Sequence, residues 1–204
     1  MATSRHAGNQ IGHLSWPDLT ARAAVEPQDL MHRAWLARAR ALAESSAAFS
    51  AGGPNIQSVC DELAEKISSV LVASCLIRPL GDEAGQLPVA FGHTRSREQP
   101  EVSTLLKANP RALVAACSAR AAEMRCSILL PDVTLRCLQL WSEPTVWPLL
   151  DELGISTLLV APVHASTRAF GSVVVWREWP AAPLCWDDQV FAEEVARRLA
   201  AACV

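Results

Sequence analysis

The sequence predicts an α/β domain of the α+β type, in which helices cover both faces of a sheet built around one hairpin. Two apolar runs, residues 155–163 and 170–176, have the length of strands and are rich in β-branched side chains. A short polar segment joins them. Neither run alternates between apolar and polar residues, so both faces of both strands are expected to be buried. Amphipathic helical patterns before and after the hairpin supply the covering layers.

Length and composition restrict the class of protein. At 204 residues, half of them apolar, the chain can bury one sizeable core. The net charge is −3 and no block of like charges occurs, so neither a nucleic-acid nor a membrane partner is expected. No apolar run reaches the ~20 residues of a membrane span, and no signal-type segment opens the chain. These features predict a cytoplasmic protein.

The chain opens with an extension and a long helix. Residues 1–26 show no sustained period and are expected to be poorly ordered or to carry one short helix over residues 18–25. A helix over residues 27–49 begins at a proline and ends before two glycines. Its stripe, at spacings of four and three, comprises Met31, Trp35, Arg38, Leu42, Ser45 and Phe49. Because the stripe includes polar residues, the helix is expected either to pair with a second copy or to lie over its own domain.

The remaining elements follow from periodicity and turn residues. An amphipathic helix over 54–71 is followed by strands over 74–80 and 87–92 and by two short helices between 100 and 124, separated at Asn109-Pro110. A strand over 127–133 then leads to an irregular segment over 134–152, with a short helix from 147. After the hairpin come a loop over 180–184 and a last helix capped by Asp187 or Asp188. Helix, helix and hairpin therefore precede the central strands.

The seven cysteines form neither a disulfide framework nor a metal knuckle by their spacing, since no C-x-x-C occurs. Most lie in apolar surroundings, which is typical of small buried hydrophobes in a reducing compartment. No metal site is expected.

Six segments within residues 36–202 carry a pattern shared with a known family: LARARALAESSAAF, SVCDELAEKISSVL, ASCLIRPLGDEAGQL, ILLPDV, LGISTLLVAPVHASTRAFGSVVVW and WDDQVFAEEVARRLAAA. In their order and local patterns they resemble a GAF domain. Pro162, Gly171 and the run to Trp176 match the penultimate hairpin of that family, and Trp186-Asp187-Asp188 matches its entry into the last helix.

The resemblance implies that residues 27–204 form a GAF-like domain. Its mixed antiparallel sheet of five to six strands would lie between a layer of the first, second and last helices and a layer of shorter helices that holds a pocket. It implies a small-molecule-sensing or protein-interaction module in bacterial-type signal transduction, without catalytic activity of its own. The expected partners are an unknown small molecule, a separate signalling effector and a second copy of the chain. The spacing on the first helix predicts that the second copy binds through Met31, Trp35, Arg38, Leu42 and Phe49, together with the last helix.

The pocket itself is predicted from composition. Residues 134–152 hold two tryptophans and two prolines in an otherwise patternless stretch, which favours a rigid aromatic lid. Trp141 and Trp147 are expected to close a cavity lined by Leu129, Leu150 and Thr157. The alternative is that both rings fill the sheet face and leave no cavity.

GAF domains that bind a bilin, a haem or a cyclic nucleotide each need particular binding residues. The positions that match the Cys-His pair of bilin-binding relatives are Thr145 and Val146, so no bilin is expected to attach there. No cofactor is predicted. A haem at His93 or a non-covalent tetrapyrrole is the alternative. Phosphate recognition, as for a cyclic nucleotide, would depend on the bases near the first hairpin, Arg78, Arg95 and Arg97, which could equally face solvent.

Free methionine sulfoxide reductases share a GAF-like fold and use pocket cysteines, which supplies an enzyme alternative. Cys117, Cys126 and Cys137 lie in the matching third of the chain, and an arginine neighbours each of the last two. The glycine-bracketed Cys and the Cys-Asp element of that family are missing. No catalytic residue is therefore predicted, and a degenerate domain that only dimerises or docks remains a third possibility.

Overall fold

The computed structural model describes residues 27–50, 56–80, 87–93, 104–106, 108–109, 111–166 and 168–203. The predicted helix over 18–25 and the predicted turn over 81–86 lie outside these residues. The chain divides into two units, Met1–Trp35 and Leu36–Val204, and the packing described below is that of the second. None of the described helices has the length and apolarity needed to cross a membrane.

The sheet has five strands in the order β2-β1-β5-β4-β3, with every neighbouring pair antiparallel. The strands are β1 (Ser74–Pro79), β2 (Ala90–Gly92), β3 (Ile128–Leu130), β4 (Ile155–Ala165) and β5 (Arg168–Glu178). The predicted hairpin is confirmed as β4 and β5, which pair Leu159 with Val175 and Val160 with Val174. Both strands lie inside the sheet, β5 between β1 and β4, and β4 between β5 and the short β3.

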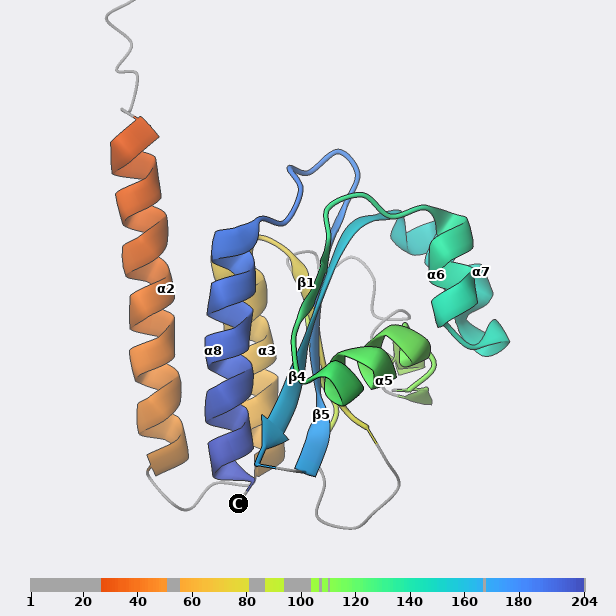
Figure 1. Ribbon diagram of the computed structural model, residues 1–204. Helices are drawn as coiled ribbons and strands as arrows, with labels where there is room; N and C mark the ends of the chain where they lie inside the picture. Colours follow the sequence, from red (N-terminus) through yellow and green to blue (C-terminus); the bar gives the residue numbers. More distant parts are fainter. Residues whose placement is uncertain are drawn as a thin grey trace, which may run out of the picture. The chain divides into compact units, whose positions relative to one another are not determined.

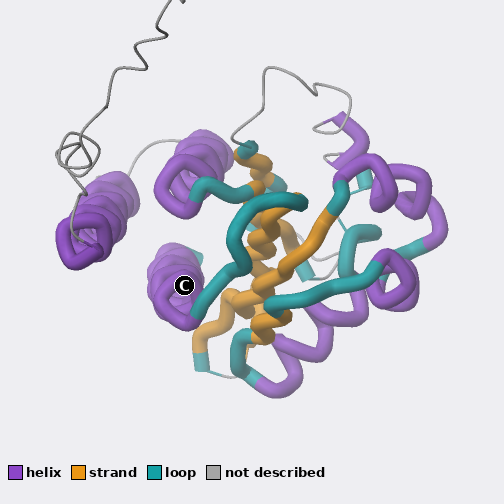
Figure 2. Tube along the Cα trace, turned by 90° about the horizontal axis from the view of Figure 1, so that it is seen from above, coloured by secondary structure: helices purple, strands orange, loops and turns teal. Residues whose placement is uncertain are grey.

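Helices cover both faces of this sheet, as the uninterrupted apolar runs predict (Figure 1). The helices α3 (Ile56–Leu71) and α8 (Trp186–Ala202) lie against one face. The other carries α5 (Ala115–Met124), α6 (Leu135–Trp141) and α7 (Trp147–Leu153), with a 3-10 turn η1 (Pro144–Val146) between the last two. Viewed from above, the strands run between these two layers (Figure 2). The predicted sandwich is thereby confirmed.

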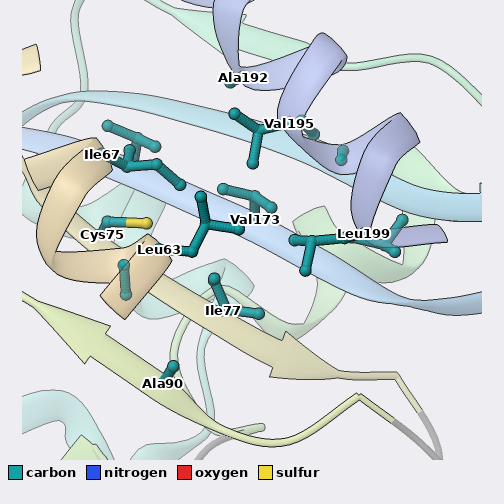
Figure 3. Packing of buried hydrophobic residues seen from close by; sticks show 14 of the residues in the cluster. Leu63, Ile67, Cys75, Ile77, Ala90, Val173, Ala192, Val195 and Leu199 are labelled. Atoms are coloured by element: carbon teal, nitrogen blue, oxygen red, sulfur yellow. The ribbon is translucent and has the colours of Figure 1, made fainter. Parts of the chain in front are cut away.

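Each layer buries its own apolar core, because alternate side chains of a strand point to opposite faces. The helix-pair face, under α3 and α8, is packed with Leu63, Ile67, Val173, Val195 and Leu199 (Figure 3). The short-helix face, under α5, α6 and α7, is packed with Leu76, Leu150, Leu158, Val174 and Trp176. β5 contributes to both cores through consecutive valines, which explains the absence of polar alternation in its sequence.

Two local predictions are corrected. The stretch before residue 147 is helical, because Thr134 caps α6 by accepting a hydrogen bond from the Cys137 backbone N–H at 3.3 Å, and Leu138 then packs into the core. The last helix is capped by Cys185, while Asp188 stands at the third helical position. There its Oδ2 accepts a hydrogen bond from the Cys185 N–H at 3.0 Å. The acid therefore completes a capping box and is not the cap itself.

Asp188 also holds the helix layer together. Its carboxylate is 1 % exposed and pairs with Arg38 of α2 (Pro27–Ser50) and, at 3.3 Å, with Arg177 of β5. Arg177 in turn donates to the Leu71 carbonyl at the end of α3, at 2.8 Å, and to two carbonyls of the loop before α8. One carboxylate thus links four segments that are distant in sequence.

The predicted dimer stripe is divided by this packing. Arg38 and Leu42 contact the chain's own domain, Arg38 through Asp188 and Leu42 against the helix-pair core. Trp35 is 63 % exposed. The side chains of Met31 and Phe49 lie outside the described ones. From Leu36 onward the helix therefore covers its own domain, and pairing with a second copy stays a prediction.

Replacing Asp188 by Asn is expected to lower the free energy of unfolding by about 3 kcal/mol, because two partly buried arginines lose their shared carboxylate. Urea denaturation followed by circular dichroism measures this loss. Asp187→Asn is the matched control, since Asp187 is an exposed acid of the same helical turn and is expected to cost at most ~1 kcal/mol. Equal losses in the two variants would contradict a stabilising role for the network.

Candidate functional site

One charged side chain enters the short-helix face of the sheet. Arg78 lies on β1 at the same parity as Leu76, so it points toward α5 and not toward α3. It is 2 % exposed. Of the bases considered for phosphate recognition, Arg95 and Arg97 lie outside the described residues. Arg78 is buried, so the alternative that this residue faces solvent is excluded.

The Arg78 guanidinium is incompletely satisfied. Its Nη1 donates to the Leu113 carbonyl oxygen at 2.6 Å, while its buried Nε has no hydrogen-bond partner. Burial lowers the pKa of Arg78 to about 10, and the nearby positive charge of Arg111 adds to this effect, which the carboxylate of Glu143 opposes. A buried cation with one neutral acceptor is an unfavourable arrangement for a protein core.

Two buried hydroxyl groups lie on the same face. Ser172 of β5 is the cross-strand partner of Arg78, which places their Cβ atoms roughly 5 Å apart. The Ser172 hydroxyl donates to Ser118 of α5 at 3.2 Å, and neither serine is exposed. Arg78, Ser118 and Ser172 therefore bring polar groups from three elements into an otherwise apolar layer.

The segment that accepts the Arg78 hydrogen bond is itself strained and anchored. Val114 adopts a left-handed conformation with φ 45° and ψ 39°, which costs a β-branched residue on the order of 1–3 kcal/mol. Its N–H donates to the Ser142 hydroxyl at 2.9 Å, and the Glu143 N–H donates to the Ala112 carbonyl at 2.8 Å. Leu113 is thus fixed on both sides by the link between α6 and α7.

A second polar group lies at the opposite end of β1. His93 is buried, with Nδ1 2.6 Å from the Ser74 hydroxyl oxygen and Nε2 3.8 Å from Glu178 Oε1. This histidine continues the alternation of β2 onto the short-helix face beside Phe91. Each ring nitrogen already faces a protein group, which does not favour haem ligation. Ser74 is buried too, so its hydroxyl is not accessible as a nucleophile.

The five predicted pocket residues are not brought together. Leu150 is buried in the short-helix core, Trp141 packs against that core, and Trp147 is 41 % exposed, with Nε1 donating to the Gln139 carbonyl at 3.2 Å. Leu129 packs against the helix-pair core instead. Thr157 lies on that same side, where its hydroxyl oxygen accepts from the Leu184 N–H at 3.2 Å. Strand alternation separates the two sets, and ligand binding by any of them stays a prediction.

Sequence reasoning missed the two serines. Their only signal was a hydroxyl residue, Ser172, at the start of an otherwise apolar strand interior. Arg78 carried a similar signal, because it follows three apolar residues inside β1. Within the described part of the chain, no group of three or more His, Cys, Asp or Glu side chains is arranged to hold a metal ion.

Solved structures share this architecture. The chain superposes on the GAF domain of a phosphoenolpyruvate-protein phosphotransferase from Coxiella burnetii with a TM-score of 0.57 at 16% identity, covering 82% of this chain and 92% of that one. For the corresponding domain from Acinetobacter the TM-score is 0.56 at 12% identity, with 80% and 90% covered. The chain has a GAF-like fold. No protein-family profile and no curated protein sequence matches it.

The same GAF-like fold occurs in an enzyme. Free methionine-R-sulfoxide reductase from Neisseria meningitidis, solved in complex with its substrate, superposes with a TM-score of 0.52 at 12% identity, covering 83% of this chain and 89% of that one. At such identities the likeness concerns the fold alone. Sensing and catalysis must be distinguished by the residues of the site.

The cysteines of this GAF-like domain lie in different surroundings. All seven are free. Cys117 lies in the short-helix core, where burial raises the pKa of its thiol from 9.0 to about 11. Cys126 is exposed just after α5, and Cys137 accepts a hydrogen bond from the Thr134 hydroxyl at 3.2 Å. Burial disfavours the thiolate that sulfoxide reduction requires, so Cys117 is not activated for attack.

Alkylation with iodoacetamide at pH 8 is expected to modify Cys126 before Cys117. The raised pKa lowers the thiolate fraction of Cys117 by roughly 100-fold, and the buried sulfur is shielded in addition. Peptide mass spectrometry of timed samples measures both rates. In urea the two cysteines should react alike, which controls for intrinsic reactivity. A Cys117 that reacts as fast as Cys126 in the native protein would contradict this assignment.

Proposed function

We propose that this chain is a ligand-sensing regulatory module and that it has no thiol-dependent catalytic activity. The observation that carries the proposal is Arg78, a buried cation on the short-helix face whose Nε has no hydrogen-bond partner. A domain that served only as a scaffold would gain stability from an apolar side chain at this position. A domain that binds a ligand uses the unsatisfied donor for recognition.

Binding at such a site couples ligand concentration to the fold. A ligand that binds the native state alone raises the free energy of unfolding in proportion to the logarithm of its concentration. Within the protein, Arg78 donates a hydrogen bond to the Leu113 carbonyl. The neighbours of Leu113, Ala112 and Val114, are hydrogen-bonded to the link between α6 and α7. Occupancy would therefore be transmitted to the short helices, where a separate signalling effector could detect it.

The alternative function is a cysteine-dependent sulfoxide reductase, which the reductase relatives of the same fold keep open. It would require one of Cys117, Cys126 and Cys137 to attack the sulfoxide and a second to resolve the intermediate. The burial of Cys117 and its raised thiol pKa argue against this use.

A reductase assay tests the proposal directly. The full chain is incubated with free methionine-R-sulfoxide and dithiothreitol, and methionine is quantified by amino-acid analysis. No methionine above the protein-free control is expected. Formation of methionine that is lost in Cys117→Ser, Cys126→Ser or Cys137→Ser would replace the sensing proposal by the enzyme. Cys60→Ser, at a cysteine buried on the helix-pair face, is the matched control.

The proposed module acts as a homodimer formed through α2. Two large apolar side chains of this helix, Trp35 and Leu36, are 63 % and 47 % exposed. Adjacent exposed apolar residues on a long helix favour pairing with the same helix of a second copy. Such a dimer would bury them without breaking the ion pair between Arg38 and Asp188.

The double substitution of Trp35 and Leu36 by Glu is expected to convert the dimer to a monomer in size-exclusion chromatography with light scattering at high micromolar concentration. Leu42 is avoided, because it packs against the helix-pair core and its loss would disturb the domain itself. Leu140→Glu, at an exposed leucine on α6, is the control and should leave the mass unchanged. A wild-type protein that is already monomeric would reject the dimer.

A further inference from the structure

We propose that Arg78 binds the carboxylate of a small monocarboxylate ligand, with Ser118 and Ser172 as neighbouring hydroxyl groups. This inference rests on the proposed sensing function and names the chemical class of the ligand. It assigns a specificity-determining role to three buried polar residues of the short-helix face.

The unsatisfied edge of the guanidinium selects the ligand geometry. Leu113 occupies Nη1, which leaves Nε as a buried donor without a partner. Nε shares its edge of the guanidinium with Nη2, and two parallel N–H donors on one edge match the two oxygens of a carboxylate. The fork of arginine is suited to this planar, bidentate recognition in a way that a lysine ammonium is not.

The hydroxyl pair adds a second set of hydrogen-bonding groups. Ser172 lies directly across from Arg78 on the neighbouring strand, and its hydroxyl donates to Ser118. The Ser118 oxygen accepts this hydrogen bond through one of its lone pairs. Its own hydroxyl hydrogen is therefore available to donate to another acceptor. A carboxylate oxygen beside Arg78 would accept from it.

The local charge favours a monoanion over a dianion. Arg78 carries one positive charge, and the described groups that act on it, the cation Arg111 and the anion Glu143, have opposite signs. A carboxylate neutralises that charge. A phosphate dianion would leave an excess negative charge in an apolar layer, which is costly. The deep burial of Arg78 further favours a small molecule over a macromolecular partner.

Ligand binding at Arg78 can change the position of α6 and α7. The Arg78 hydrogen bond to Leu113 adjoins Val114, whose strained backbone is held by Ser142. When a carboxylate takes the Nε edge, the guanidinium shifts toward the ligand and the Leu113 contact changes. Because the same segment is bonded to the link between α6 and α7, these helices respond to the ligand.

Acetate is the probe for this site. The full chain is titrated with sodium acetate up to roughly 50 mM against sodium chloride at constant ionic strength, and the melting temperature is recorded. A saturable rise with a dissociation constant near the millimolar range is expected, as few-atom ligands bind weakly. Inorganic phosphate, in a parallel titration, is expected to bind at least ~10-fold more weakly.

Three variants test the residues. Arg78→Lys keeps the charge but loses the fork, and it is expected to weaken acetate binding by at least ~10-fold. Ser118→Ala is expected to weaken it by roughly 3- to 10-fold. Arg120→Gln, at an exposed arginine on the same helix as Ser118, is the matched control and should bind like the wild type.

A direct spectroscopic measurement guards against misfolding of the variants. In a ¹H–¹⁵N spectrum, the Nε–H resonance that disappears in Arg78→Lys belongs to Arg78, and it should shift saturably with acetate in the wild type. A resonance that does not shift, binding that survives Arg78→Lys, or phosphate that binds more tightly than acetate would each overturn the proposal. Such failures leave the sensing function intact when the reductase assay is negative, whereas methionine formation would reject the sensing function itself.

Discussion

Burial of β4 and β5 on both faces is the constraint on which this structure depends. Each strand presents consecutive apolar side chains, so a single covering layer would leave half of them in water. The two helix layers follow from this requirement. A further consequence concerns polar groups, because any that enters either layer loses contact with solvent and must find its partners within the protein.

The two layers treat their buried charges differently. On the helix-pair side, Asp188 has two arginine partners and the Cys185 N–H, and Arg177 is bonded to several carbonyl groups. On the short-helix side, Arg78 has one carbonyl and an unsatisfied Nε. The first arrangement pairs its charges with ions of opposite sign and links segments of the fold, although Arg38 Nε has no hydrogen-bond partner. In the second, the described residues hydrogen-bonded to the cation are limited to one neutral carbonyl, and a buried cation of that kind is where we propose a ligand.

A shared fold does not distinguish the activities found on it, which is why the side chains decide the interpretation. The GAF-like architecture occurs both in the phosphotransferase domains and in the sulfoxide reductase with which this chain was compared. The interpretation of this chain therefore depends on its own local chemistry. Its short-helix layer buries a cysteine whose thiol pKa is raised to about 11, and in the same layer it buries an arginine beside two serine hydroxyls.

The sequence by itself determined the order of the elements, the central hairpin and the presence of two covering layers, because these follow from local periodicity and from apolar runs. It did not determine which polar residues meet. Leu129 and Thr157 were grouped with Leu150, yet strand alternation directs both of them to the helix-pair face, whereas Leu150 lies in the short-helix core. Arg78, Ser118 and Ser172 come from three distant segments, and only sheet register and helix packing bring them together. Contacts of this kind depend on tertiary structure, since no local pattern in the chain specifies them.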